Sequence, residues 1–386
     1  MKLILERGKW GTKMKVLFIT NIPSPYRVDF FNELGKLCDL TVVYERHHSI
    51  VRDSRWHSKC VNNYHEVYLN GIKTGEAETI SLDIIKYISD RSFDRIIIGM
   101  YSSPSSMIAI EYMRLHNIPF YLSTDGGFIK QEPVLMKALK RHFISSAAYW
   151  FSPSDMATDY LVHYGAIREK IEKYPFTSIS ELDMRFAARY SVSKQKSRID
   201  LGVQEEHVLL SVGRFSYQGG HGKGYDTLMH VAKLLNPSFG IYIVGDEPTD
   251  EFLSWKVLHH LDHVHFVGFK PKDELADYYA MADAFILLTR GDVWGLVINE
   301  AMSFSLPIIT TKQCLSGVEL VCDGENGFLV EADDIIGTMD CIRKTFASGN
   351  ILAQMCSCSR QKIESYTIEN MAKSYFSFLS SANHLH

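Results

Sequence analysis

Short apolar stretches rich in β-branched and aromatic residues alternate with longer amphipathic stretches along this chain. The short stretches are typical of strands buried in a parallel sheet, and the longer ones of helices that bury one face against it. The apolar stretches that we expect to form strands are residues 15–20, 40–44, 95–99, 120–123, 207–214, 239–245, 264–268, 284–288 and 306–310. Such an alternation predicts an α/β protein with right-handed crossovers between parallel strands.

Changes in this pattern divide the chain of 386 residues, which is long enough for two domains. Residues 1–13 are basic and unpatterned, and we expect a disordered arm there. An N-terminal domain is expected over residues 14–180 and a C-terminal domain over residues 181–365, joined through the loosely patterned polar stretch 177–196. A last helical pattern occupies residues 366–386.

A strand that feeds directly into a helix is predicted by residues 283–302. The backbone N–H groups of a helix's first turn have no partner within the helix and favour an anion such as phosphate. Here they would belong to Gly295, Leu296 and Val297. Two carboxylates flank the turn, Asp292 and Glu300, and beside a phosphate they need hydroxyl or cationic partners, which indicates a sugar diphosphate. The alternative is an N-terminal cap at Asp292 and a solvated Glu300 on the helix.

A resemblance to the Glu-x7-Glu signature of retaining glycosyltransferases of family 4 is carried by Asp292-Val-Trp-Gly-Leu-Val-Ile-Asn-Glu300 and by Leu306-Pro-Ile-Ile after it. Members that build capsule, exopolysaccharide or lipopolysaccharide have the GT-B fold, in which two Rossmann-like domains face each other across a cleft. The resemblance implies this fold for nearly the whole chain, with the C-terminal helix crossing back onto the N-terminal domain. It also implies that Asp292 contacts the donor sugar and Glu300 the ribose. The sequence departs from the family at Asp292, because the family has the longer Glu there.

A second motif, Gly213-Arg214-Phe followed by Lys223-Gly-Tyr-Asp, resembles the family's donor-phosphate motif. The resemblance implies that Arg214 and Lys223 bind the diphosphate. Their chemistry fits this role, because a guanidinium offers phosphate a planar fork, an ammonium offers a compact charge, and both stabilise the charge that grows on the leaving group. Similar enzymes pair the nucleobase with the chain after the third strand of this domain, which nominates Phe269 and Lys270.

The N-terminal half is expected to bind the acceptor. The resemblance places Asp125 and Gly126, in a loop at the edge of the sheet, close to the reacting centre, where Asp125 would orient or deprotonate the acceptor hydroxyl. An Asp-Gly turn without function is an equal alternative. Tyr26 and Arg27, in the first loop of the domain, are further acceptor-binding candidates, although an Arg at a helix start is as often solvated. The polar stretch 45–63 is another candidate, since long loops in compact domains are often functional.

Composition and charge disfavour several classes of protein and site. The formal net charge is -4, whereas a nucleic-acid binder normally has a basic excess, so no nucleic-acid partner is expected. Seven scattered cysteines do not form a disulfide framework and indicate a reducing compartment, hence a cytoplasmic location. No Asp-x-Asp motif stands near the donor loop, and Arg and Lys would take the part that a divalent metal has in other glycosyltransferases. We therefore expect neither a metal nor a cofactor.

A basic amphipathic helix is predicted at residues 133–147, with Leu135, Leu139 and Phe143 on one face. Its basic residues are Lys137, Lys140 and Arg141. We expect them to make peripheral contact with the inner face of a membrane, as in related enzymes that act on lipid-linked acceptors. The alternative is that the apolar stripe packs into its own domain, as most such stripes do.

These features together predict a retaining transferase that moves a hexose-type sugar from a nucleotide diphosphate, with a UDP-sugar favoured over a GDP-sugar, to a glycan or lipid-linked glycan hydroxyl. The residues expected to act in catalysis are Asp125, Arg214, Lys223 and Asp292. Two other functions stay open: a non-catalytic sugar-nucleotide-binding subunit of a glycan-assembly complex, and a sugar-nucleotide epimerase of the same architecture. A nicotinamide-dependent enzyme is disfavoured because no strand is followed by the complete glycine fingerprint and ribose acid.

Overall fold

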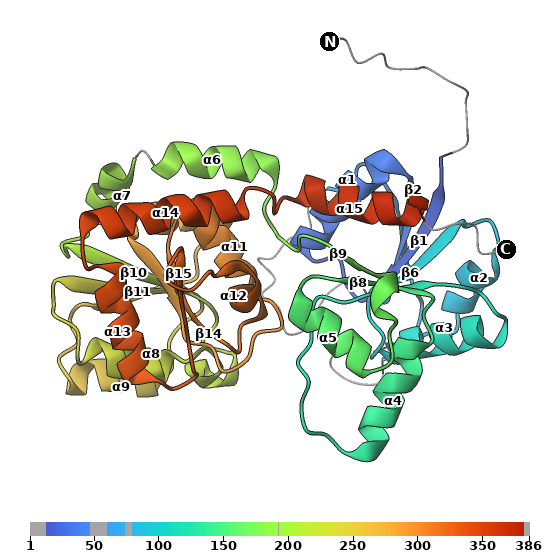
Figure 1. The fold of residues 1–386 in the computed structure, drawn as a ribbon, viewed down its shortest axis with the longest axis horizontal. Coiled ribbons are helices and arrows are strands. Elements are labelled where there is room, and N and C mark those ends of the chain that lie inside the picture. Colours follow the sequence, from blue (N-terminus) through green and yellow to red (C-terminus); the bar gives the residue numbers. More distant parts are fainter. Residues whose placement is uncertain (1–12, 47–59, 74–78, 192, 382–386) are drawn as a thin grey trace, which may run out of the picture.

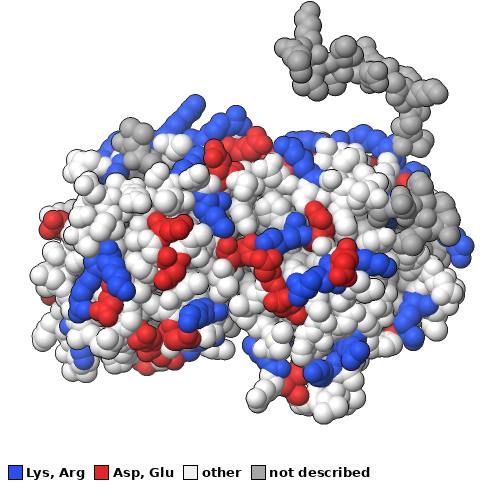
Figure 2. All heavy atoms as spheres, viewed as in Figure 1, with Lys and Arg blue, Asp and Glu red and all other residues white. Residues whose placement is uncertain are grey.

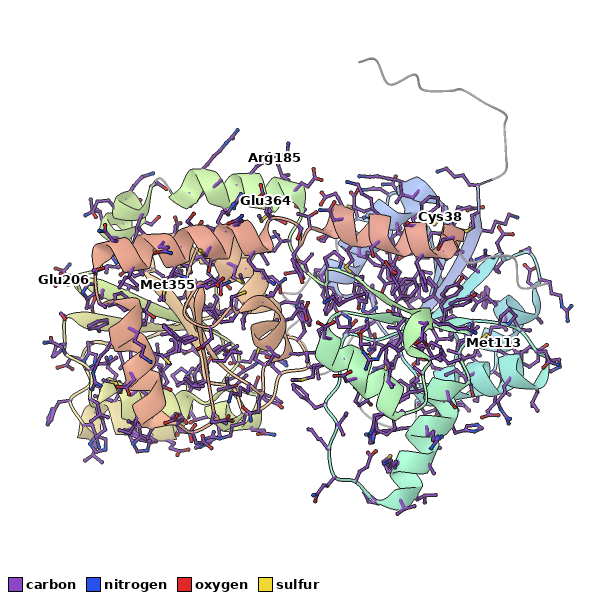
Figure 3. The ribbon with its side chains drawn as sticks, viewed as in Figure 1. Cys38, Met113, Arg185, Glu206, Met355 and Glu364 are labelled. Carbon is purple, nitrogen blue, oxygen red and sulfur yellow. The ribbon has the colours of Figure 1, made fainter. Side chains whose placement is uncertain are left out.

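The computed structural model shows two α/β domains that lie side by side (Figure 1). The residues that it describes are 13–46, 60–73, 79–191 and 193–381. Residues 1–12 of the expected arm, and residues 47–59 of the polar stretch considered for acceptor recognition, lie outside the described residues. Each domain has its own hydrophobic interior. Cys38, labelled in Figure 3, belongs to the interior of the N-terminal domain, and Met355 to the interior of the C-terminal domain.

The N-terminal domain is built on a parallel seven-stranded sheet with the order β3-β2-β1-β6-β7-β8-β9. Its strands are β1 (Lys15–Thr20), β2 (Asp39–Tyr44), β3 (His65–Tyr68), β6 (Arg95–Ile98), β7 (Tyr121–Ser123), β8 (Tyr149–Ser152) and β9 (Ile171–Lys173), with β4 (Ile72–Lys73) and β5 (Thr79–Ile80) paired outside the sheet. Its helices are α1 (Pro25–Leu37), α2 (Ile84–Ser89), α3 (Pro104–Leu115), α4 (Val134–Ser145), α5 (Asp155–His163) and the short 3-10 helix η1 (Arg168–Lys170). All residues of β1 after the first are buried, as expected for a central strand of a parallel sheet covered on both faces.

The C-terminal domain repeats this plan with a parallel six-stranded sheet in the order β12-β11-β10-β13-β14-β15. Its strands are β10 (His207–Val212), β11 (Phe239–Val244), β12 (Val264–Gly268), β13 (Ala284–Leu287), β14 (Ile308–Thr311) and β15 (Gly327–Val330). Its helices are η2 (Gln218–Lys223), α8 (Tyr225–Ala232), α9 (Asp250–Leu258), α10 (Lys272–Met281), α11 (Leu296–Ser303), α12 (Leu315–Leu320), α13 (Ile335–Thr345) and α14 (Gly349–Ile363). Because β10 and β13 are neighbours, the loops that leave their carboxyl ends lie next to each other.

Two stretches connect the domains. The first holds α6 (Glu181–Ser191) and α7 (Lys194–Asp200), so the polar stretch predicted as a linker is largely helical. The second leads from α14 to α15 (Ile368–Ser381), which lies against α1 of the N-terminal domain (Figure 1). Tyr375 of α15 stacks on Phe151 with ring centroids 4.0 Å apart, and its hydroxyl lies 2.6 Å from Ser123 Oγ. The last helix therefore packs one of its faces onto the N-terminal domain.

The carboxyl ends of the two sheets meet where the domains touch. Trp294, in the loop after β13, packs against Phe176 with ring centroids 5.3 Å apart. Gly126, in the loop after β7, has a φ of 140° and lies so close to Val293 that a Cβ on the glycine would come within 2.4 Å of Val293 O. Any other residue would therefore suffer both steric overlap and backbone strain here. This contact brings the expected acceptor loop against the expected donor loop.

Candidate active site

The turn between β13 and α11 has the strand, turn and helix arrangement that the sequence predicts. The strand is buried along its whole length, and the helix begins at Leu296 after Gly295, whose φ is 93°. A Cβ on Gly295 would approach Cys314 Sγ to 2.7 Å, so glycine is required at this close, left-handed position. The helix therefore directs its first N–H groups, including those of Leu296 and Val297, to the carboxyl edge of the sheet.

Lys223 and Asp292 form an ion pair at this helix start. Lys223 Nζ lies 2.5 Å from Asp292 Oδ2, and the two side chains are 16% and 20% exposed. The lysine is the last residue of η2, in the connection between β10 and α8, and its Nζ lies 5.6 Å from the centre of the Tyr217 ring. The structure thus joins two residues from different motifs, one expected to bind the diphosphate and the other the donor sugar.

Arg290 fixes the loop that carries Asp292. Its guanidinium donates two hydrogen bonds to the carboxylate of Asp226, at 2.8 and 2.7 Å, and pairs with Asp333 at 2.5 Å. Its backbone N–H donates to Gly222 O at 3.0 Å, which ties the loop to η2. Arg290 was not predicted to have a role, although its partner Asp226 belongs to the Lys-Gly-Tyr-Asp motif and was the available signal.

Arg214 follows β10 and is exposed. The turn after it is anchored, because the N–H groups of Phe215 and Ser216 donate to the carboxylate of Asp246, the second at 3.0 Å. Asp246 was not predicted to lie at the site. The signal was its place just beyond β11, after Gly245, since an acid at the carboxyl end of a parallel strand lies at the edge where ligands bind.

Glu300 lies in the second turn of α11 and reaches towards α10. Its carboxylate accepts hydrogen bonds from Tyr279 OH at 2.9 Å and from Ser178 Oγ at 3.2 Å. Burial raises the pKa of Glu300 above its ordinary value, and the hydrogen bond from Tyr279 opposes this rise. The residue borders a cavity of about 580 Å³ between α6, α10 and α11. Phe269 and Lys270 directly follow β12, and the lysine pairs with an acid of α10 at 3.3 Å.

Arg27 and Asp125 form a second ion pair, in the N-terminal domain. Arg27 Nη2 lies 2.7 Å from Asp125 Oδ2, and Tyr26 OH donates to the same oxygen at 3.2 Å. Burial lowers the pKa of Arg27, whereas the Asp125 carboxylate raises it, and the resulting pKa of Arg27 lies above its ordinary value. The side chain of Arg27 is 11% exposed, so the solvated alternative is wrong. Asp125 also occupies a turn, which Thr124 Oγ1 closes by accepting from the Gly126 N–H at 3.1 Å.

Trp294 and Asn299 link α11 to the N-terminal domain. Trp294 Nε1 donates to Asn299 Oδ1 at 2.9 Å, and Asn299 Nδ2 donates to Phe176 O at 3.1 Å. Both side chains are buried, and neither was predicted to have a role. The available signal was an amide among the apolar residues of a short helix, because a buried amide requires hydrogen-bond partners.

The apolar stripe of α4 does not pack into its own domain as the alternative required. Only Phe143 of the stripe is buried, while Leu135 and Leu139 are 82% and 40% exposed. Val134, at the start of the helix, is also exposed. In Figure 1 the helix projects from the body of the domain, and Figure 2 shows neutral side chains beside Lys and Arg side chains on this projection.

The basic residues of α4 divide into two kinds. Lys137 and Arg141 are exposed. Lys140 instead pairs with Glu132 at 2.5 Å and lies 5.3 Å from the centre of the Tyr164 ring. The charge of Lys140 is therefore already matched within the domain, which leaves Lys137 and Arg141 as the exposed basic residues of this helix.

Two features, a cluster of metal-ligating side chains and a membrane-spanning helix, are absent from the described part of the chain. Across residues 13–46, 60–73, 79–191 and 193–381, no group of three or more His, Cys, Asp or Glu side chains is arranged to hold a metal ion. Nor does any helix in those ranges have the length and hydrophobicity that a bilayer span needs.

The fold is that of the GT-B glycosyltransferases, which confirms the predicted architecture. The crystal structure of HepE from Anabaena in complex with UDP and glucose matches with a TM-score of 0.71 at 16% identity, covering 95% of this chain and 100% of HepE. Residues 193–361 match the family model described as glycosyl transferases group 1, so the C-terminal half carries a domain of this kind.

Two curated relatives are similar over less than half of this chain. An uncharacterized glycosyltransferase of Haemophilus influenzae is 32% identical over 177 residues, which are 44% of this chain and 48% of that protein. The sulfoquinovosyl transferase of Arabidopsis thaliana is 29% identical over 163 residues, 41% of this chain and 30% of that protein. The chain thus spans about half the length of these relatives or less.

Proposed function

We propose that this protein is a retaining glycosyltransferase that moves a hexose-type sugar from a nucleotide diphosphate, with a UDP-sugar favoured, to a hydroxyl of a glycan or a lipid-linked glycan. The observation that carries the proposal is the pairing of Lys223 with Asp292 at the start of α11, beside the loop that holds Asp125. The complex of HepE with UDP and glucose supports a nucleotide-sugar donor.

The donor binds to the C-terminal domain in this proposal. Lys223, Arg214 and the first turn of α11 take the diphosphate, because an ammonium, a guanidinium and a helix N-terminus each favour phosphate oxygens. Asp292 accepts hydrogen bonds from hydroxyls of the sugar, and Glu300 from those of the ribose. The nucleobase lies near Phe269 and Lys270.

The acceptor hydroxyl is oriented by Asp125. Arg27 and Tyr26 both donate to Oδ2 of this carboxylate, so Oδ1 is the oxygen that receives the acceptor's proton. The hydroxyl attacks on the face from which the diphosphate leaves, and the configuration of the sugar is retained. Arg214 and Lys223 stabilise the leaving diphosphate, so the transfer needs no metal ion. The closed domain contact excludes water that would hydrolyse the donor.

A panel of UDP-, GDP- and ADP-sugars tests the proposal with the purified protein. A ligand at a hundredfold excess over its Kd adds roughly 2.7 kcal/mol to the free energy of unfolding, so the donor raises Tm. Release of the nucleoside diphosphate with glycan acceptors then measures turnover, which EDTA leaves unchanged and Glu300→Ala lowers. Asp340→Asn, at an exposed acid of α13, is the matched control.

Other results would contradict the proposed mechanism or the proposed function. Strict dependence of turnover on Mn²⁺ would refute the metal-independent mechanism. Donor binding without turnover on any acceptor would indicate a non-catalytic subunit, and conversion of the donor without acceptor would indicate an epimerase. If no sugar nucleotide raises Tm, the proposal itself is wrong.

We also propose that α4 rests on an anionic membrane surface. Leu135 and Val134 are 82% and 85% exposed, and Lys137 and Arg141 provide charges of the sign that anionic lipids attract. Because the loop of Asp125 leads into α4, a lipid-linked acceptor held in the membrane would reach the site along this segment. Such docking places the enzyme at the surface where a lipid-linked glycan is found.

Vesicle sedimentation tests the membrane contact. Vesicles with phosphatidylglycerol should retain the protein at low salt and lose it at high salt, since screening weakens the attraction. Substituting Val134 and Leu135 together by Ser should abolish the binding, whereas Ile336→Ser, at an exposed apolar position of α13, should not. Equal retention of both variants would contradict docking through α4.

A further inference from the structure

The ion pair of Lys223 and Asp292 joins two groups that the proposed mechanism assigns to different parts of the donor. The nitrogen and oxygen lie 2.5 Å apart, and both side chains are more than three-quarters buried. In the proposed function the lysine binds the diphosphate and the aspartate binds the sugar. Because the Lys223 ammonium holds the carboxylate here, donor binding must rearrange this pair.

The carboxylate of Asp292 lies close to the anion site at the start of α11. Its Cγ is 3.6 Å from the place that a Cβ would take on Gly295, the residue before the helix. The charge is felt by the neighbouring thiol as well: burial, and after it the Asp292 carboxylate, raise the pKa of Cys314 to about 11. A helix N-terminus and an ammonium both favour an anion nearby. In this structure that anion is the protein's own Asp292 carboxylate.

The backbone of Asp292 is fixed, so its carboxylate has little room to withdraw. Its N–H donates to Gln313 O at 2.9 Å, and its C=O accepts from the Leu315 N–H at 3.2 Å. An aspartate side chain is one methylene shorter than a glutamate and moves only by rotation about two bonds. A diphosphate bound to Lys223 would thus stand beside a carboxylate that has lost its cation, which is unfavourable unless new donors satisfy it.

The hydroxyls of a sugar are such donors. An intact sugar nucleotide brings phosphate oxygens to Lys223 and hydroxyl groups to Asp292 at the same time, so each member of the pair exchanges one partner for another. A nucleoside diphosphate without sugar brings only the phosphate. It displaces Asp292 from Lys223 and offers the carboxylate nothing in return.

Resting on the function proposed above, we infer that Asp292 is a specificity-determining residue that competes with the diphosphate for Lys223 and so makes the site prefer the intact donor over the nucleoside diphosphate. After transfer the sugar hydroxyls depart with the acceptor, and the ion pair forms again. The returning carboxylate displaces the product. The same residue that binds the sugar therefore promotes release of the spent nucleotide.

Calorimetric titration with UDP, GDP and ADP tests this inference on the wild type, Asp292→Asn, Lys223→Met and the double variant. Asp292→Asn removes the charge at nearly constant volume and should bind the nucleoside diphosphate about tenfold more tightly, because the Lys223 ammonium no longer has a competing anion. In the Lys223→Met background the same substitution should have a much smaller effect. The preference for sugar nucleotide over nucleoside diphosphate should fall in Asp292→Asn, and Asp340→Asn should bind like the wild type.

The outcomes separate the inference from the function on which it rests. Competition at Lys223 is refuted if the wild type binds a nucleotide and Asp292→Asn binds it no more tightly. It is also refuted if the Asp292→Asn substitution increases the affinity equally in the presence and in the absence of Lys223. If no variant binds any of the three nucleotides or their sugars, the proposed function is refuted as well. Should circular dichroism show Asp292→Asn to be unfolded, Asp292→Ser removes the charge with a smaller side chain and gives the same comparison.

Discussion

The two ion pairs at the domain contact differ in how firmly they hold their carboxylates. Arg27 is a planar, permanently charged group, and Asp125 Oδ2 accepts from both this guanidinium, at 2.7 Å, and Tyr26. Lys223 holds Asp292 through a single ammonium on a flexible stem, at 2.5 Å. A buried guanidinium fixes the orientation of its partner, whereas an ammonium can exchange one anion for another. If the proposed function is right, the acceptor side is therefore preformed, and the donor side is expected to rearrange when the ligand binds.

The largest effect that we expect from this difference is a loss of catalytic activity in the Lys223→Met variant. Loss of one electrostatic group that stabilises a developing charge lowers the rate by about 100- to 1000-fold, and we expect kcat/KM for the cognate donor to fall by that amount. The free energy of unfolding should fall by less than on removal of Arg27, because a flexible ammonium loses more side-chain freedom in forming its ion pair than a preorganised guanidinium does. Lys312→Met, at an exposed lysine paired with Glu331, is the control. A loss of less than about tenfold would place the diphosphate away from Lys223.

The next largest effect is on stability, through Arg27→Met. This substitution leaves Asp125 without its cation, and we expect the free energy of unfolding to fall by about 2 kcal/mol, less than for a fully buried pair because the Asp125 side chain is 30% exposed. Urea denaturation measures the change. A second substitution, Asp125→Asn, should recover part of the loss, since no charge is then left unpaired. If Arg27→Met and Lys223→Met cost the same, the two pairs do not differ as described.

Glu300 differs from the two paired carboxylates, because the uncharged hydroxyls of Tyr279 and Ser178 donate hydrogen bonds to it. Burial raises its pKa from 4.5, so between that value and the raised one the folded state binds more protons than the unfolded state. The free energy of unfolding must then fall as pH rises through this window, by about 1.4 kcal/mol for each unit of pKa shift. Glu300→Gln should remove this pH dependence in denaturation curves measured from pH 4 upwards, roughly across the usual titration range of Glu. An unchanged slope would show that Glu300 is not the titrating group.

The arrangement of the donor side could be predicted from the sequence because local rules determine it. Strand patterns predict β10 and β13, parallel sheets place their carboxyl ends at one edge, and the motifs put Lys223 and Asp292 in the loops that follow. Gly295 marks the helix start through its positive φ, which the position after the turn requires. The patterns predict two α/β halves, whereas the GT-B fold was expected from the resemblance of the two motifs to those of family 4 glycosyltransferases.

Contacts that depend on the docking of distant elements could not be predicted in this way. Trp294 packs against Phe176 of the other domain, and nothing in the local pattern shows that partner. Lys140 was placed on a basic face by helical periodicity, but Glu132 folds back to neutralise it. The side chain of Asp246 could not be assigned to the turn after β10 either, because its partners are backbone N–H groups, which carry no signature in the sequence.

The smallest expected effect concerns Glu319, which connects the two regions. It lies on α12, whose first residue donates to the backbone of Asp292, and its carboxylate pairs with Lys173 of the N-terminal domain at 3.1 Å. Because Lys173 is 45% exposed, Glu319→Gln should lower the free energy of unfolding by only about 0.5 kcal/mol. If the contact also holds the domains closed, the affinity for a sugar nucleotide should become weaker than that small loss of stability explains, while the affinity of Asp340→Asn stays that of the wild type. Unchanged affinity would mean that the ion pair of Glu319 and Lys173 does not hold the domains closed, and that other contacts between them, such as that of Trp294 with Phe176, suffice.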